Sequence, residues 1–213
     1  MTHVTINTTR RISPQIISTA ENGSPSLSHA VYLDGFNFLI GGSQVSAALC
    51  GIAPSASYAA MNGICNFAWR GNFAALLGWA VGTKNIKDAR AVCVGSSAAG
   101  ATSNTLWNAA AFAGWETITP TRNAAGKEKE TDVALSVLLL EDLLLAKGNK
   151  SSIDVTIISG DRDLVPAVNA LARHGIRVDI ASWNHSTSAA LKSAARRFIP
   201  LDDYFNLLSH EPK

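Results

Sequence analysis

The sequence predicts an α/β fold with a mainly parallel central sheet, and two observations support this prediction. First, short runs rich in β-branched and other apolar residues recur along the chain, at positions 30–33, 91–94, 155–158 and 177–181. Continuous apolar strands of this kind are typical of a parallel sheet, because helices cover both of its faces. Second, longer segments with apolar residues at helical spacing separate these runs, and alternating strands and helices form right-handed crossover units.

The remaining segments can be placed in order along the chain. Residues 1–27 are rich in Thr, Ser and Asn and show no sustained period, so we expect a loosely attached arm. A single domain is expected over 28–208, followed by a short tail at 209–213. Residues 41–65 are rich in Gly, Ser and Ala and fit neither a helix nor a strand. Apolar spacing predicts helices over 66–81, 105–113, 132–146, 166–174 and 187–197.

Composition and charge limit the class of protein. With 47% hydrophobic and 16% charged residues, the chain can bury an ordinary core, which excludes wholesale disorder. A net charge of +2 does not by itself indicate nucleic-acid binding. The three cysteines are widely spaced, which argues against a disulfide scaffold or a structural zinc site. The N-terminus lacks a secretory pattern and the apolar runs are too short to span a membrane, so we expect a cytoplasmic protein without a membrane partner.

Acidic residues follow two of the predicted strands and begin one of the predicted helices. Asp34 follows the first strand, Asp161 and Asp163 follow the third, and Asp132 begins the helix over 132–146. The carboxyl ends of parallel strands meet at one edge of a sheet, where ligands bind, so we expect these four carboxylates to converge. Like charges this close oppose folding unless a cation neutralises them. Because all the donors are hard oxygens, the sequence predicts a site for Mg²⁺ or Mn²⁺.

Each of these residues also has a structural interpretation. Asp34 could cap a turn, Asn37 could form an Asx turn, and Asp132 could lie in a first helical turn for its dipole. Asp163 could cap the helix that begins near Pro166. We favour the functional interpretation because the predicted sheet brings all four acids to one edge.

Three segments that contain these acids resemble the signatures of NYN domains, which are PIN-like nucleases that include the bacterial LabA-like branch. They are Val31-Tyr32-Leu33-Asp34-Gly35-Phe36-Asn37, Lys129-Glu130-Thr131-Asp132-Val133-Ala134-Leu135 and Ser159-Gly160-Asp161-Arg162-Asp163-Leu164-Val165-Pro166. The resemblance runs from about residue 29 to 204 and includes a closing segment at 195–201. It implies a PIN-like three-layer α/β/α sandwich and metal-dependent hydrolysis of RNA. It also implies catalytic and metal-binding roles for Asp34, Asp132, Asp161 and Asp163, with Asn37 supporting the site.

The chain departs from the family pattern at two positions. Leu138 stands where many relatives carry a further acid, and Arg162 replaces the small residue usual between the two aspartates. The first departure could lower metal affinity, and the second could add a phosphate contact or crowd the site. Residues that could hold an RNA backbone are Lys129, Arg122, Lys127 and Arg162, although Lys127 and Lys129 alternate with acids and fit a solvated loop equally well.

Other functions stay open at this point. One alternative is a non-catalytic NYN-type module that binds RNA or protein, and Leu138 favours it slightly. Another is a small-molecule phosphatase, while a phosphate-binding loop at 95–102 is excluded because Ala101 occupies the lysine position. RNA is the expected partner and a homodimer is possible. Trp183 is the candidate for stacking on a base, whereas the core is the expected place for Trp69, Trp79, Trp107 and Trp115.

Overall fold

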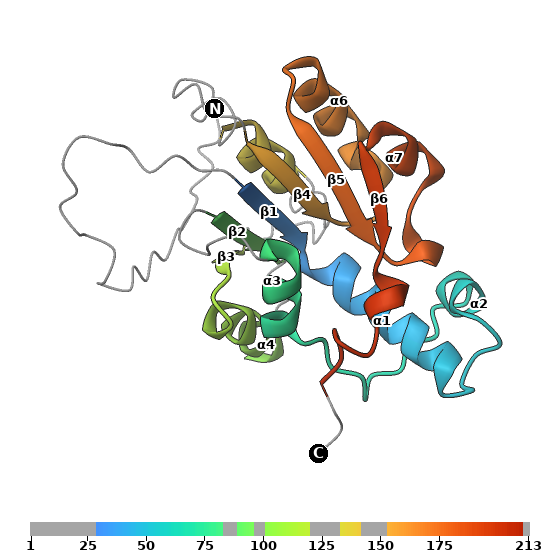
Figure 1. Cartoon of the computed structure of the whole chain (residues 1–213). Helices are drawn as coiled ribbons and strands as arrows, with labels where there is room; N and C mark the ends of the chain where they lie inside the picture. The colour runs from blue at the N-terminus through green and yellow to red at the C-terminus, as the bar shows by residue number, and fades with distance from the viewer. Residues whose placement is uncertain (1–28, 83–88, 96–100, 120–132, 142–152, 211–213) are drawn as a thin grey trace, which may run out of the picture.

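The computed structural model describes residues 29–82, 89–95, 101–119, 133–141 and 153–210. Within these ranges, six strands form one sheet with the order β3-β2-β1-β4-β5-β6, and every neighbouring pair is parallel (Figure 1). The strands are β1 His29–Asp34, β2 Ala89–Val94, β3 Glu116–Ile118, β4 Asp154–Ile158, β5 Arg177–Ser182 and β6 Arg197–Pro200. The α/β prediction is confirmed, and the four predicted strands correspond to β1, β2, β4 and β5.

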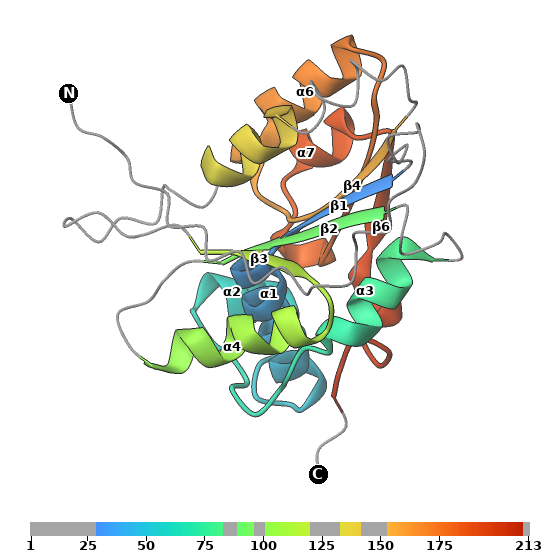
Figure 2. The same cartoon turned by 90° about the vertical axis from the view of Figure 1, so that its left-hand side faces the viewer.

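Helices cover both faces of the sheet, as Figure 2 shows with the sheet lying between two helical layers. One layer contains α6 Val165–Arg173, α7 Ala189–Ala194 and the helical residues 133–141. The other contains α1 Gly35–Leu49, α2 Ala56–Met61, α3 Phe73–Val81 and α4 Ala101–Phe112. This arrangement is the three-layer α/β/α sandwich that the resemblance to NYN domains implies.

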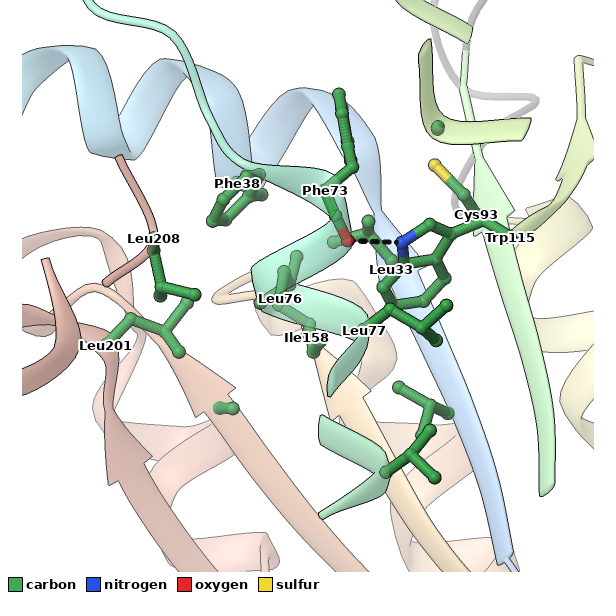
Figure 3. Packing of buried hydrophobic residues seen from close by; sticks show 14 of the residues in the cluster. Leu33, Phe38, Phe73, Leu76, Leu77, Cys93, Trp115, Ile158, Leu201 and Leu208 are labelled. Carbon is green, nitrogen blue, oxygen red and sulfur yellow. Dashed lines mark hydrogen bonds between the residues drawn. The ribbon is translucent and has the colours of Figure 1, made fainter. Parts of the chain in front are cut away.

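Successive strand residues alternate between two hydrophobic cores, because side chains along a strand point to opposite faces. Tyr32 and Ile157 contribute to the core beneath α6 and α7. Leu33, Cys93 and Ile158 contribute to the other core, which α1, α3 and α4 complete (Figure 3). In that second core the indole nitrogen of Trp115 donates a hydrogen bond of 2.9 Å to the Phe73 carbonyl, which fixes α3 against the β3 edge.

Helix α1 includes part of the segment 41–65, whose sequence fits neither a helix nor a strand. Its small residues explain why the sequence did not predict a helix there. A Cβ atom at Gly41 would lie 2.2 Å from the Trp183 ring, and one at Gly42 would lie 2.2 Å from the Trp69 ring. Glycine therefore permits the close packing of two tryptophans against the helix, although it weakens the helical signal in the sequence.

Three other predictions also need correction. The helix expected from residue 66 begins at Phe73, after Asn72 accepts the capping bond from the Ala75 amide, and Phe67 is 80% exposed. The last helix is shorter than expected, and its predicted end lies partly in β6, beyond α7. The short strand β3 was not predicted. The helices over 105–113 and 166–174 are confirmed as α4 and α6. The predicted arm at 1–27 lies outside the described residues.

Trp183 cannot stack on a base, which corrects the prediction made for it. Its side chain is fully buried, and its indole nitrogen donates a 2.9 Å hydrogen bond to the Phe38 carbonyl. The rings of Phe38, Trp69 and Phe205 surround it. Of the four tryptophans predicted in the core, Trp107 and Trp115 are buried, and the rings of Trp69 and Trp79 are partly buried against it. Among the described helices, none is long and apolar enough to cross a bilayer.

Candidate active site at the ends of β1 and β4

The strand order creates a switch point between β1 and β4. From β1 the chain builds β2 and β3 on one side of the sheet, then returns to build β4, β5 and β6 on the other. In open parallel sheets the crevice beyond such a switch point is the usual ligand site. Asp34 is the last residue of β1, and Ser159, Gly160 and Asp161 directly follow β4. The fold therefore places two of the predicted acids at this crevice.

Asp34 is a buried carboxylate, only 6% exposed, with neutral hydrogen-bond partners. One carboxylate oxygen caps α1 by accepting a 3.0 Å bond from the Asn37 amide, and the other accepts a 3.2 Å bond from the Ser159 hydroxyl. Burial raises the pKa of Asp34 above its ordinary value, the hydrogen bonds from Asn37 and Ser159 oppose the rise, and the charge of Asp161 adds to it. Within the described ranges, no Arg, Lys or His forms an ion pair with this carboxylate.

Ser159 connects Asp34 to Asp161. Its hydroxyl oxygen accepts a 3.2 Å hydrogen bond from the Asp161 amide while its proton is donated to Asp34. Asp161 in turn caps the 3₁₀ helix η2, Arg162–Leu164, by accepting a 2.9 Å bond from the Asp163 amide. The two acids therefore belong to one hydrogen-bonded unit at adjacent strand ends.

Asn37 holds this unit together from the first turn of α1. Its side-chain oxygen accepts a 3.0 Å hydrogen bond from the Gly160 amide, and the Ser182 hydroxyl lies 3.5 Å from the same oxygen. Asn37 thus joins α1 to the ends of β4 and β5, rather than forming a local Asx turn. These contacts are compatible with the supporting role that the resemblance implies for it.

Some of the other predicted site residues lie among the described residues, and the rest lie outside them. Asp163 is exposed on η2, and in the described part of the chain no three Asp, Glu, His or Cys side chains lie together as a metal-binding group. Leu138 is partly buried against the core beneath α6. The residues that lie outside the described ranges are Asp132, Lys129, Arg122 and Lys127, so their predicted roles stay predictions.

The two described carboxylates suit a magnesium or manganese ion. Mg²⁺ in proteins is commonly held by one or two carboxylates, with water completing the coordination. Asp34 and Asp161 supply hard oxygen donors, and no basic side chain among the described residues forms an ion pair with the buried Asp34 carboxyl. A bound cation would offset the cost of ionising this buried group.

Beside the two acids lies an open pocket of about 420 Å³, lined by Asn37, by Gly160–Arg162 and by His185–Ser188. His185 lies in the 3₁₀ helix η3, Asn184–Ser186, and its Nε2 lies 2.8 Å from the Gln44 side-chain oxygen. Burial lowers the pKa of His185, although the charge of Asp202 opposes the shift, so the imidazole is neutral at neutral pH.

Sequence reasoning missed Ser159, Ser182, Gln44 and His185. Ser159 lies inside the segment that carries the resemblance, so its position beside two acids was available as a signal. Gln44 lies in the stretch that fitted neither template. No sequence signal connects it to His185, because the pair is 141 positions apart and becomes adjacent only in the fold.

Comparisons with known proteins identify the family and the fold. The family model described as NYN domain matches residues 30–202. A crystal structure of a protein of unknown function from Vibrio parahaemolyticus is similar in fold, with a TM-score of 0.58 and 14% sequence identity. That match covers 89% of this chain and 100% of the other. No curated protein sequence matches the chain.

Proposed function

The chain belongs to the NYN domain family of PIN-like nucleases, and from this premise we propose that it is a metal-dependent ribonuclease. The proposed reaction is hydrolysis of RNA phosphodiester bonds at the crevice beyond β1 and β4. The proposed metal ligands and catalytic residues are Asp34, Asp132, Asp161 and Asp163, with Mg²⁺ or Mn²⁺ as the ion.

The burial of the Asp34 carboxyl, with no cationic partner among the described residues, is the observation that carries this proposal. A fold seldom keeps a carboxylate shielded from water without a cationic partner, because the cost of removing the charge from water is large. Among the described residues Asp34 has only neutral donors, and the nearby charge of Asp161 raises its pKa further. Strongly perturbed carboxyl groups in a cleft are typical of functional sites.

The protein's own residues would prepare the site for the ion. Ser159 orients Asp34, and Asn37 holds the Gly160 backbone, so the two carboxylates stay in place without the metal. The metal, when bound, would lower the pKa of a water molecule and stabilise charge on the phosphoryl group. Because Asp34 and Asp161 leave the ends of rigid strands, we propose them as the primary ligands, with Asp132 and Asp163 binding a second ion or orienting water.

Cleavage of single-stranded RNA tests the proposal directly. We expect the purified protein to cut a labelled RNA in Mg²⁺ or Mn²⁺ and to be inactive in excess chelator. Asp161→Asn should abolish cleavage while keeping the cap on η2, because an Asn side chain can still accept the Asp163 amide bond. Asp203→Asn, at an exposed acid that takes no part in the site, is the control for loss of one surface charge.

Two results would contradict the proposal. Equal activity of the wild-type protein and Asp161→Asn would show that any cleavage comes from a contaminant. RNA binding without cleavage in either metal would support the alternative of a non-catalytic module, which Leu138 favours slightly.

A further inference from the structure

The pocket beside the acids has two walls that are held at a fixed separation. The Ser188 amide donates a 3.1 Å hydrogen bond to the Gly160 carbonyl, which joins the segment after β4 to the segment after β5. The walls approach closely because Gly160 has no side chain: a Cβ atom there would lie 2.4 Å from the Ser186 carbonyl oxygen. The pocket is therefore a built feature of the fold rather than a gap between mobile side chains.

Arg162 brings a free positive charge to one wall. It is exposed, lines the pocket, and forms no ion pair within the described part of the chain, even though Asp161 and Asp163 flank it. His185 on the other wall is neutral, so Arg162 is the cation among the described residues that line the pocket. An unpaired guanidinium offers a planar fork of donors that matches the oxygens of a phosphate group.

The opposite wall presents two hydroxyl groups, those of Ser186 and Thr187, whose protons are already used. The hydroxyls of Ser186 and Thr187 both donate to the Trp183 carbonyl, at 3.3 Å and 2.7 Å. Their oxygen atoms therefore remain available as acceptors. A group that faces these two oxygens must donate a hydrogen bond. The ribose 2′-hydroxyl is such a donor, and DNA lacks it.

We propose that this pocket binds one ribose–phosphate unit of the RNA strand, next to the bond that is cut. Arg162 holds the phosphate, and the Thr187 oxygen accepts a hydrogen bond from the 2′-hydroxyl. The inference rests on the proposed function and adds a substrate preference to it. Apart from the His185 imidazole, no aromatic ring among the described residues lines the pocket, so we expect the site to contact the backbone and to select RNA over DNA rather than a particular base.

Binding of matched RNA and DNA strands tests this proposal. Asp34→Asn serves as the background, so that the strand is bound without being cut, and binding of a labelled eight-nucleotide strand of A and C is followed by fluorescence anisotropy in Mg²⁺. We expect the RNA to bind about fivefold more tightly than the DNA, the value of one neutral hydrogen bond. Adding Thr187→Val should reduce this ratio to about one, and Thr187→Ser, which keeps the oxygen, should restore it.

The Arg162 arm of the experiment is independent of Thr187. Arg162→Ser should weaken binding of both strands by about tenfold and should reduce the slope of log affinity against log salt by about one. Arg173→Ser removes the same charge from the far end of α6 and should change neither quantity. Melting curves of every variant would identify any that fails to fold.

The outcomes separate this inference from the nuclease proposal. Equal affinity for RNA and DNA in the Asp34→Asn background, or an affinity unchanged by Arg162→Ser across the salt series, would overturn the pocket assignment. The cleavage assay on the wild-type protein is a separate measurement. The expected binding pattern without cleavage would overturn the nuclease proposal alone, and cleavage without the binding pattern would overturn the pocket alone.

Discussion

Two buried aspartates in the same sheet have opposite electrostatic surroundings. Asp34, at the end of β1, has neutral hydrogen-bond donors and a raised pKa. Asp179, within β5 and 3% exposed, accepts two hydrogen bonds of 2.8 Å and 2.7 Å from Arg196 and one of 2.7 Å from Arg197. Burial alone would raise the pKa of Asp179, but these two arginines outweigh it and hold the pKa below its ordinary value.

The comparison shows that the chain can neutralise a buried acid where the acid serves the fold. Both arginines come from the entry to β6, and they join two neighbouring strands through one carboxylate. At Asp34 no described residue plays this part, and the neighbouring acid Asp161 makes the charge costlier. A buried acid that the fold leaves without a cation is therefore better explained by a ligand than by stability.

The largest expected effect comes from replacing Asp34. Asp34→Asn should keep the cap on α1, because an Asn oxygen can accept the Asn37 amide bond, while it removes a proposed metal ligand. We expect RNA cleavage to fall by more than about 100-fold, since even residues that only orient a metal ligand can matter by that factor. Cleavage rates measured over a range of Mn²⁺ concentrations give the size of the effect. A loss restored by more metal would indicate weakened affinity rather than loss of the reaction.

Replacing Asp179 should lower stability and leave cleavage unchanged, the reverse of the effect expected at Asp34. Asp179→Asn leaves Arg196 and Arg197 without a charged partner, but both are exposed enough to regain water, at 39% and 64% of the side chain. We therefore expect a loss of about 2 kcal/mol in the free energy of unfolding, below that of a fully buried pair. In a domain of this size the melting temperature should fall by roughly 4–8 °C. Cleavage per folded molecule should stay unchanged, and a selective loss of cleavage would remove the distinction between the two aspartates.

Replacing two glycines, one in the wall of the pocket and one away from it, should have smaller effects on stability and binding. Gly160→Ala would push a Cβ atom to 2.4 Å from the Ser186 oxygen, so the wall of the pocket must move. Gly175→Ala, after α6, meets no atom within 4 Å but strains a backbone with φ of +76°. Each should cost about 1–2 kcal/mol of stability. Only Gly160→Ala should weaken RNA binding, and titrations of both variants would show whether the two effects separate.

Much of the site followed from the sequence because it depends on local order. Asp34 and Asp161 each follow a recognisable apolar strand, and parallel strands bring their carboxyl ends to one edge. The register of β1 and β4 confirms this, with Leu33 paired to Ile158 directly before the two acidic segments. Strand identity and strand direction were sufficient for that prediction.

The features that failed depend on partners far along the chain. Helix α1 has a weak helical signal because Gly41 and Gly42 leave room for Trp183 and Trp69, which no local pattern reveals. Trp183 lies just after β5 at the expected edge, yet its ring points into the core because that room exists. Asn37 was expected to support the site because of the family resemblance, but no local pattern predicts its bond to Gly160, 123 positions away.

The pH dependence of stability offers the test with the smallest expected effect and the highest specificity. As pH rises, the contributions of the two aspartates to stability should change in opposite directions. The folded protein binds a proton at Asp34 more readily than the unfolded chain does, since the folded pKa is above the ordinary value of 3.8. In chelator, stability therefore declines as pH rises through the window between 3.8 and that raised pKa. Asp34→Asn removes the decline. The difference between its melting temperature and that of the wild-type protein should therefore increase across that window and stay constant above it.

Asp179 supplies the opposite case, because its folded pKa lies below the ordinary value of 3.8. Its contribution to stability is present above that ordinary value and is lost as pH falls through the lowered pKa. The stability deficit of Asp179→Asn should therefore shrink with acidification, because the wild-type protein loses the contribution of Asp179. The stability advantage of Asp34→Asn should also shrink, because protonation of Asp34 removes the destabilising charge from the wild-type protein. Melting curves of the three proteins from about pH 3 to about pH 8 in chelator would show both trends. A pH-independent offset for Asp34→Asn would mean that this carboxylate carries no uncompensated charge, which would remove the main argument for a cation at β1.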